Sequence, residues 1–209
     1  MIIDDVRIPN DLLDAMKNNN FVVFVGAGVS MGNPTCLPSF KKLVELIQSN
    51  TGETYDESET YERFLGRLNS KNIDVHKKAA EQLIGKNLKY NDLHSYIINL
   101  FKNIDDIKIV TTNYDTMLEQ ALETGGHSGI DVYNTPALPL GDNFKGIVHI
   151  HGNVQNPDSM ILTDEDFGKA YITEGYVSRF LIKLFENNNV LFIGYSYDDT
   201  IVKYLTRER

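Results

Sequence analysis

Four short segments of the sequence carry residue types that could hold a small anionic ligand and act on it. They are GAGVS at 26–30, TTNYD at 111–115, HIHGN at 149–153 and GYSYDD at 194–199. A glycine-rich turn can bring backbone N–H groups close to phosphate oxygens. An asparagine and an aspartate can orient hydroxyl groups or water, and a histidine with a pKa near about 6.5 can take up a proton. Together these residues favour acid–base chemistry on a phosphate-bearing ligand.

Each of the four segments belongs to, or follows, an apolar run that predicts a buried strand. The runs carry β-branched and aromatic side chains without regular polar alternation, as expected when both faces of a sheet are covered. They lie at 21–26, 107–112, 147–151 and 190–195, and helix-like stretches start at Leu37, Asn91 and Tyr114. The sequence therefore predicts an α/β fold, a doubly wound Rossmann-like parallel sheet, with a ligand crevice beyond the carboxyl ends of the strands.

One segment, at about 49–89, interrupts this alternation of strand and helix. A polar, turn-rich stretch is followed by two amphipathic helix patterns with no strand between them. We interpret it as a small helical insertion in one domain that spans 1–209, and it could either add surface helices or cover the crevice.

The chain ends in a helix-like stretch, TIVKYLTRER, without a turn signal. We therefore expect a further domain to follow in a longer protein.

The composition indicates a globular chain that lacks a broad phosphate-neutralising surface. Among its 209 residues, 20 are basic and 29 acidic, which gives a formal charge of −9 and argues against direct nucleic-acid binding. The single cysteine, Cys36, excludes an internal disulfide and a four-cysteine zinc module, and is typical of a reducing compartment. The apolar runs are shorter than the roughly 18–20 residues that cross a bilayer. We expect a cytoplasmic protein without a membrane segment.

The spacing of the glycines narrows the type of nucleotide site. Gly32 comes one residue too late for the G-x-G-x-x-G fingerprint. No acidic residue ends a second strand about 20 residues further on, where a dehydrogenase would bind the ribose. An ordinary dehydrogenase is therefore disfavoured, and a P-loop is disfavoured because the turn has no glycine-lysine pair. A plainer interpretation is that GAGVS is only a tight strand-to-helix turn.

In their order along the chain, GAGVS, TTNYD, the HG pair and a late glycine-serine strand end resemble the NAD-binding core of the sirtuins. The resemblance is closer to the sirtuin-like NAD hydrolases of bacterial anti-phage defence proteins, and it covers Phe21 to about Asp199. Two departures from the sirtuin deacetylases set this chain apart. A chain with one cysteine cannot build the four-cysteine zinc module of the deacetylases. The deacetylases also carry a Pro-Asp-Phe-Arg run after the glycine motif, where this chain has Pro38, Ser39, Phe40 and Lys41.

The resemblance implies a role for each motif residue. It implies that His151 is the catalytic base and that Asn113 acts beside the nicotinamide ribose. It also implies cofactor binding by Gly26, Ala27, Gly28 and Ser30 at the pyrophosphate, by Thr112 and Asp115 near the nicotinamide end, by Gly152, and by Gly194 and Ser196 at the adenosine half. NAD is then the substrate, and no zinc or other metal is expected.

The function that the resemblance implies is hydrolysis of NAD to nicotinamide and ADP-ribose, in anti-phage defence by NAD depletion. Breaking this N-glycosidic bond builds positive charge on the ribose, as in glycoside hydrolysis. The nicotinamide departs neutral, so no strong acid is required. Two alternatives are a non-catalytic module that senses NAD or ADP-ribose and an NAD-dependent protein deacylase. We also expect a homo-oligomer or a partner defence protein.

Plainer interpretations of single residues stand beside these roles. His149 could be a satisfied core histidine on the same strand face as His151, or the two could bind a metal. Asn113 could cap the helix that follows it. Helices are expected to begin at Asp198 and Asp199 and at the acidic run 164–167. The remaining histidines, His76, His94 and His127, are expected on helix surfaces or in loops.

Overall fold

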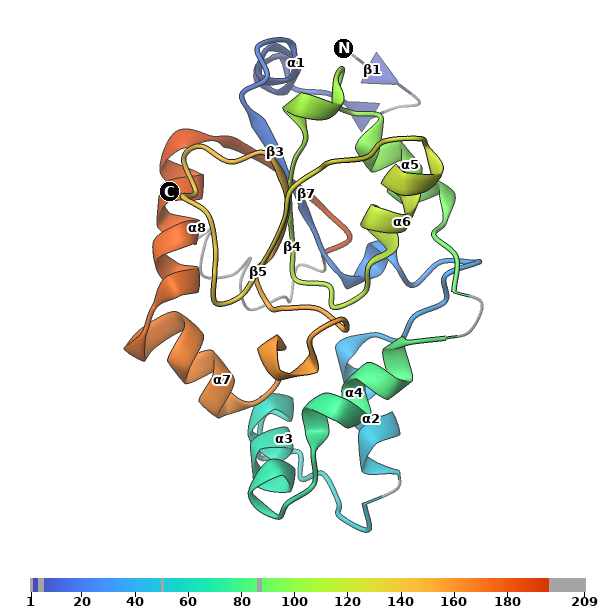
Figure 1. Cartoon of the computed structure of the whole chain (residues 1–209), viewed down its shortest axis with the longest axis vertical. Helices are drawn as coiled ribbons and strands as arrows, with labels where there is room; N and C mark the ends of the chain where they lie inside the picture. Colours follow the sequence, from blue (N-terminus) through green and yellow to red (C-terminus); the bar gives the residue numbers. More distant parts are fainter. Residues whose placement is uncertain (1, 4–5, 50, 86–87, 196–209) are drawn as a thin grey trace.

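The computed structural model describes residues 2–3, 6–49, 51–85 and 88–195 of the chain (Figure 1). Its centre is a five-stranded parallel sheet in the order β5 (Val132–Asn134), β6 (Gly146–His149), β4 (Lys108–Thr111), β3 (Phe21–Val25) and β7 (Asn189–Ile193). The α/β prediction and the four predicted strands are confirmed. The edge strand β5 was not predicted, because its three residues are partly or fully exposed and carry no apolar run.

Helices cover both faces of this sheet, as the doubly wound fold requires (Figure 1). One face packs against α1 (Asn10–Lys17), α5 (Asp92–Ile98) and α6 (Met117–Thr124). The other packs against α7 (Asp164–Gly168), a π-helix η4 (Lys169–Thr173) and α8 (Tyr176–Asn187). Alternate residues of β3 enter the two clusters, with Val23 in the first and Phe24 in the second. Because both faces of the strand are buried, its sequence is apolar throughout.

A separate group of three helices forms its own apolar cluster beyond the carboxyl ends of the strands, and we call it the helical unit. It consists of α2 (Phe40–Gln48), α3 (Tyr61–Ser70) and α4 (Val75–Leu83). The two helices predicted within 49–89 are confirmed as α3 and α4. The cluster begins before residue 49, because Leu43, Val44 and Ile47 of α2 pack against α3 and α4 rather than on the sheet.

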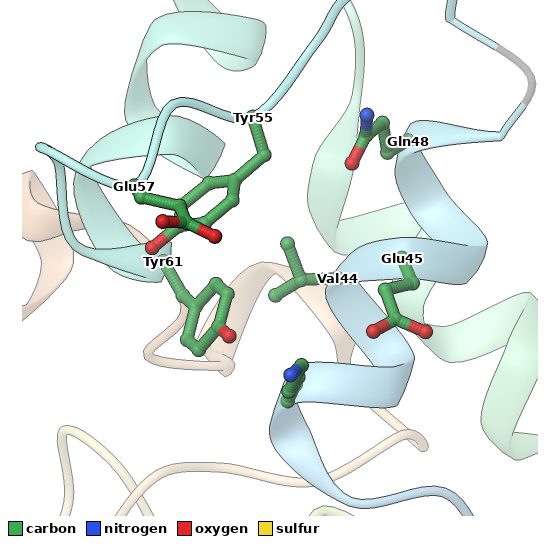
Figure 2. A pocket seen from close by; sticks show the side chains of 7 residues that line it. Val44, Glu45, Gln48, Tyr55, Glu57 and Tyr61 are labelled. Carbon is green, nitrogen blue, oxygen red and sulfur yellow. The ribbon is translucent and has the colours of Figure 1, made fainter.

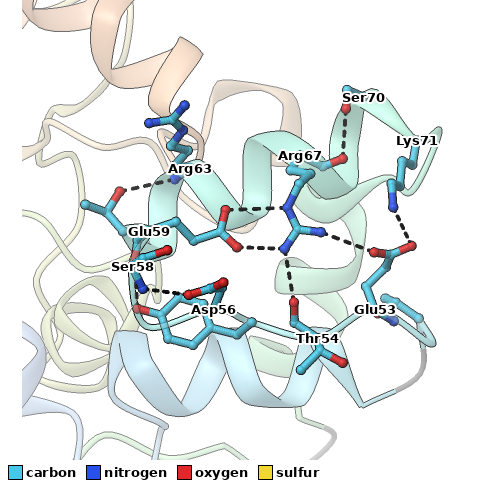
Figure 3. A network of polar contacts seen from close by, with 12 residues as sticks. Glu53, Thr54, Asp56, Ser58, Glu59, Arg63, Arg67, Ser70 and Lys71 are labelled. Atoms are coloured by element: carbon cyan, nitrogen blue, oxygen red, sulfur yellow. Dashed lines mark hydrogen bonds and ion pairs between the residues drawn. The ribbon is translucent and has the colours of Figure 1, made fainter.

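The loop between α2 and α3 is held by charged side chains (Figure 3). Arg67 of α3 forms ion pairs with Glu59 at 2.6 Å and with Glu53 at 3.2 Å, and its guanidinium also donates to the Thr54 carbonyl. Lys71 adds a second ion pair with Glu53, at 2.7 Å. These contacts fold the polar stretch against α3, so it does not hang free over the strand ends.

The helical unit rests on segments that follow strands β4 and β6. Tyr114, Val154, Met160 and Leu162 contribute to its cluster. The Tyr114 hydroxyl donates to the Ile161 carbonyl at 2.7 Å, which ties the two segments together. The unit therefore sits next to the edge of the sheet where the sequence predicts a ligand crevice.

Short elements complete the described chain. They are the antiparallel pair β1 (Ile2–Ile3) and β2 (Val6–Arg7) and the 3-10 turns η1 (Ala27–Val29), η2 (Ile104–Asp106) and η3 (Pro157–Ser159). Within the described ranges, every helix is too short or too polar to cross a membrane.

Candidate functional site

The glycine turn leaves β3 and enters the short 3-10 helix η1, and the long helix α2 begins only at Phe40. The Gly26 N–H donates to the Ile193 carbonyl and the Gly28 N–H to the Gly194 carbonyl, both at 2.9 Å. In this structure the end of β7 therefore engages two of the N–H groups that were expected to face a pyrophosphate. Ala27 and Gly28 are exposed, whereas Gly26 is buried.

The close approach of this turn to Gly194 explains why glycines stand here. A Cβ atom on Gly28 would lie 2.8 Å from the Gly194 carbonyl oxygen and 3.0 Å from its Cα atom. Gly194 itself has φ +77°, and a Cβ atom there would lie 2.7 Å from Val29. The sheet order reverses at β3, with β4 on one side and β7 on the other, and such a switch point is the usual ligand crevice of an open α/β sheet.

We predict that Gly28→Ala destabilises the protein by about 1–3 kcal/mol, because the new methyl group meets backbone atoms that cannot turn aside. Gly32→Ala is the matched control: its Cβ atom would meet only Asn91 Nδ2, at 3.6 Å. We expect the control to change the free energy of unfolding by less than about 1 kcal/mol. Urea denaturation of both variants measures the difference, and equal stabilities would contradict the close contact.

Asn113 lies just after β4 and is fixed by its side-chain amide. Its Nδ2 group donates to the Gly26 carbonyl at 3.2 Å and to the Ser30 hydroxyl at 3.3 Å. Its Oδ1 atom is buried and has no hydrogen-bond partner among the described residues. The suggestion that Asn113 caps the next helix is wrong, because Asp115 Oδ1 accepts the Met117 N–H at the start of α6 instead. Burial raises the pKa of Asp115, and hydrogen bonds from Met117 and Ser30 offset part of that rise.

His149 is a satisfied core histidine, as one interpretation of the sequence had it. It is fully buried, its Nδ1 donates to the Asn113 carbonyl at 3.0 Å, and its Nε2 donates to Glu119 of α6 at 2.6 Å. Burial alone would lower its pKa, but the Glu119 carboxylate, with smaller contributions from the Asn113 carbonyl and Asp115, outweighs burial, so the pKa of His149 is raised. Both ring nitrogens are thus engaged by the protein. Over the described residues, no group of three or more metal-ligating side chains occurs.

His151 faces the opposite side of the sheet from His149, which corrects the expectation that they share a face. Strand β6 ends at His149, and the chain turns there, with the Gly152 N–H donating to the His149 carbonyl. The His151 ring then packs edge-on against Phe167 and Tyr171. The alternation of side chains holds only inside a strand.

The environment of His151 keeps its imidazole neutral. The side chain is buried, and desolvation lowers the pKa of His151 to about 3. Its Nε2 atom lies 2.7 Å from the Tyr171 hydroxyl, within hydrogen-bond distance. Tyr171 belongs to the π-helix η4, a rare element that often marks functional sites.

The other predicted site residues fall at the same edge of the sheet. The Thr112 hydroxyl bonds the Tyr195 hydroxyl at 2.6 Å, which links the ends of β4 and β7. Gly152 has φ +75°, and a Cβ atom there would meet the Ser159 backbone, so the fold itself requires glycine. Ser196, Asp198 and Asp199 lie outside the described residues. The acidic run at 164–167 begins helix α7, as predicted.

Further polar residues, which were not predicted from the sequence, lie at the carboxyl ends of the strands. Buried polar atoms without a partner among the described residues also occur on Asn134, the last residue of β5, and on Asn153, after β6. Together with Asn113 they mark the ends of three adjacent strands, which fits a polar ligand that supplies the missing hydrogen bonds. Asn153 follows the HG pair directly and could have been noticed, whereas Asn134 and Tyr171 carry no local signal.

One further expectation was wrong. His94 was expected on a helix surface or in a loop, but it is 1% exposed and its Nε2 lies 3.2 Å from the Ser30 hydroxyl. His76 is half-buried and paired with Asp166 at 2.8 Å, and His127 is exposed.

A surface pocket of about 290 Å³ lies in the helical unit (Figure 2). It is lined by Lys41, Val44, Glu45, Gln48, Tyr55, Glu57 and Tyr61. None of these residues belongs to the four motif segments. The site at the strand ends is therefore defined by its polar side chains, and this pocket is a separate feature.

Comparison with known proteins agrees with this architecture. The uncharacterized protein y4cA of Sinorhizobium fredii (strain NBRC 101917 / NGR234) is 29% identical over 219 residues, which covers 94% of this chain and 18% of that protein. NAD(+) hydrolase ThsA of Bacillus cereus (strain MSX-D12) is 23% identical over 209 residues, which covers 93% of this chain and 41% of that protein. The chain thus spans less than half the length of either relative. Residues 107–209, just under half of the chain, match the family model described as SIR2-like domain.

Proposed function

We propose that this chain is an NAD hydrolase that cleaves the bond between nicotinamide and ribose. The match to the SIR2-like family and the similarity to a protein named NAD(+) hydrolase support an enzyme that acts on NAD. The observation that carries the proposal is the orientation of the Asn113 amide. Its Nδ2 group is held by Gly26 and Ser30, so its buried Oδ1 atom is left as an acceptor without a partner among the described residues. A ribose hydroxyl or an attacking water would satisfy it.

The proposed reaction needs an acceptor for one proton. The bond between C1′ and the nicotinamide nitrogen breaks, its electron pair neutralises the pyridinium ring, and a water oxygen bonds to C1′. The proton of that water passes to a base, for which we propose His151, because its depressed pKa keeps it unprotonated at neutral pH. For the phosphates we propose the exposed turn at Ala27, because the N–H groups of Gly26 and Gly28 donate to carbonyls at the end of β7. For the carboxamide we propose Asp115.

One observation favours a second candidate, a module that binds NAD or ADP-ribose without cleaving it. The Nε2 atom of His151 is already bonded to Tyr171, and burial makes its imidazole a weak proton acceptor in this conformation. A catalytic role therefore requires that substrate replaces the Tyr171 contact or that the proton reaches the other ring nitrogen.

The test is to incubate the pure protein with NAD and to measure free nicotinamide, with and without an acetyl-lysine peptide. Peptide-independent release supports hydrolysis. Release only with the peptide would identify a deacylase, and NAD binding without release would identify a sensor; either result would overturn the proposal. Binding is measured separately by calorimetry.

We predict that His151→Ala lowers kcat for nicotinamide release by about 10²–10⁴-fold, the usual contribution of a positioned base. His127→Ala is the matched control, because His127 is exposed and lies in a loop after α6. Both variants are first checked by circular dichroism. A His151→Ala variant that is folded and turns over at the wild-type rate would rule out this residue as the base.

For the biological setting we propose anti-phage defence by depletion of cellular NAD. This rests on the sequence resemblance, and the whole protein's partners and any oligomer belong to the same proposal. The test is to infect cells that carry either the wild-type gene or the Asn113→Ala variant and to measure cellular NAD over time. We expect NAD to fall only in the cells with the wild-type gene.

A further inference from the structure

The first helical turn of α5 is unusual because its capping residues are buried against the glycine turn. Asn91 and His94 form a capping box, in which the Asn91 side chain accepts the Leu93 and His94 N–H groups and the Asn91 N–H donates to His94 Nδ1. They are 7% and 1% exposed. The Asn91 Nδ2 group also donates to the Val29 carbonyl at 2.8 Å. This helix start is therefore attached to the segment that carries Ser30.

Two contacts involve His94 Nδ1. The Asn91 N–H points at it at 3.2 Å, and Asn91 Oδ1, which can only accept, lies 2.9 Å from it. Nδ1 therefore accepts from the Asn91 backbone in one neutral tautomer and donates to Oδ1 in the other. Burial lowers the pKa of His94, which favours a neutral ring. His94 Nε2 lies 3.2 Å from the Ser30 hydroxyl and bonds it in either tautomer, as donor in the first and as acceptor in the second.

The Ser30 hydroxyl is held from two sides. It accepts from Asn113 Nδ2 at 3.3 Å and bonds His94 Nε2 at 3.2 Å. It is 2% exposed. A hydroxyl group has one donor and two acceptor positions, so these two contacts fix its direction. The hydroxyl is thus engaged by His94 and Asn113, whereas the sequence resemblance implied a role for Ser30 at the pyrophosphate.

We propose that His94 is a positioning residue, which acts through Ser30 to hold the amide of Asn113 with its oxygen turned toward the strand-end site. The catalytic part of this inference rests on the proposed NAD hydrolysis. With His94 in place, the Ser30 hydroxyl cannot rotate, so Nδ2 of Asn113 stays on Ser30 and Gly26. Without it, the Ser30 hydroxyl loses one of its two partners and the amide of Asn113 can turn.

Two His94 variants and one Ser30 variant test the chain of contacts. His94→Leu removes the Nε2 atom that bonds Ser30, and His94→Gln retains an amide that can donate to or accept from Ser30 at a similar distance from the backbone. We expect His94→Leu to lower kcat about tenfold or more with KM changed less than about threefold, since a misplaced group loses rate rather than binding. His94→Gln should restore most of kcat. Restoration by glutamine separates positioning from a general loss of packing.

A double-mutant cycle makes the route through Ser30 explicit. If His94 acts through Ser30, the kcat of the Ser30→Ala, His94→Leu double variant should equal that of Ser30→Ala alone. Additive losses would overturn the proposal, and so would a His94→Leu variant whose kcat is within about twofold of the wild type. The cycle is interpreted only for variants whose thermal unfolding is cooperative.

A measurement that needs no activity keeps this inference distinct from the proposed function. The side-chain ¹⁵N signals of His94 in NMR spectra should report a neutral ring, and Ser30→Ala should shift them while the exposed His127 signals stay unchanged. A protonated ring at neutral pH, or indifference to Ser30→Ala, would overturn the inference. If the wild-type protein releases no nicotinamide, the proposed function fails, but the NMR result still decides the His94–Ser30 contact.

Discussion

Replacing Asn113 with alanine is expected to reduce nicotinamide release by at least about 100-fold, the usual cost of removing one fixed polar group that stabilises a transition state. The reason is the buried Oδ1 atom, which the neighbouring hydrogen bonds to Nδ2 aim away from Gly26 and Ser30. The variant also loses those two bonds, which we expect to cost about 1–3 kcal/mol of stability. Steady-state rates and urea denaturation measured on one preparation separate the two effects.

The matched control for this variant is Asn103→Ala. Asn103 is exposed, precedes β4 at the opposite edge of the sheet, and its side chain donates to the nearby Asp106 at 2.7 Å. We expect wild-type turnover for it. If Asn113→Ala retains more than about a tenth of the wild-type kcat, the amide does not carry transition-state stabilisation of the expected size.

The second large effect is on stability and concerns the His149–Glu119 pair. His149→Ala is expected to lower the free energy of unfolding by about 3–5 kcal/mol, because it leaves the Glu119 carboxylate beside a cavity without its partner. Glu119 is 16% exposed in its side chain and its Oε2 atom already has no partner among the described residues. Glu119→Gln keeps an acceptor for His149 and should cost less, about 1–2 kcal/mol.

The same pair gives a pH dependence whose sign is fixed. The pKa of His149 is raised in the folded protein, so protonation of this residue stabilises the fold. That contribution is fully present below the unfolded pKa of about 6.5 and is lost as pH rises through the folded pKa. His94 and His151 have lowered pKa values and act in the opposite sense, but both are present in Glu119→Gln.

The difference in unfolding free energy between wild type and Glu119→Gln therefore reports mainly on the pair, because Glu119 is the smallest of the influences on the pKa of His94. We expect this difference to shrink as pH is raised from 6 toward and beyond the raised folded pKa, and urea denaturation at a series of pH values measures it. A difference that stays constant across this range would mean that His149 is neutral throughout and that the pair is an ordinary hydrogen bond.

The sequence predicted those parts of the fold that depend on local pattern. Both faces of β3, β4, β6 and β7 are covered, so each strand is a short apolar run that can be recognised without a structure. Strand β5 could not be recognised, because an exposed three-residue edge strand owes its form to pairing with β6 rather than to its own side chains. The motif residues could be expected at one edge because the carboxyl ends of parallel strands meet there.

Only the tertiary structure decided what each polar group does. By sequence His149 and His151 are equivalent members of one H-x-H motif, yet the pKa of His149 is raised beside Glu119, while the pKa of His151 is lowered by burial against Tyr171. The turn after β6 separates them. Likewise, the sequence shows that Ser30 follows the glycine turn, but only the packing of α5 brings the buried His94 side chain next to Ser30. A hydrogen bond depends on the positions of two groups that lie far apart in the chain, and only packing fixes those positions.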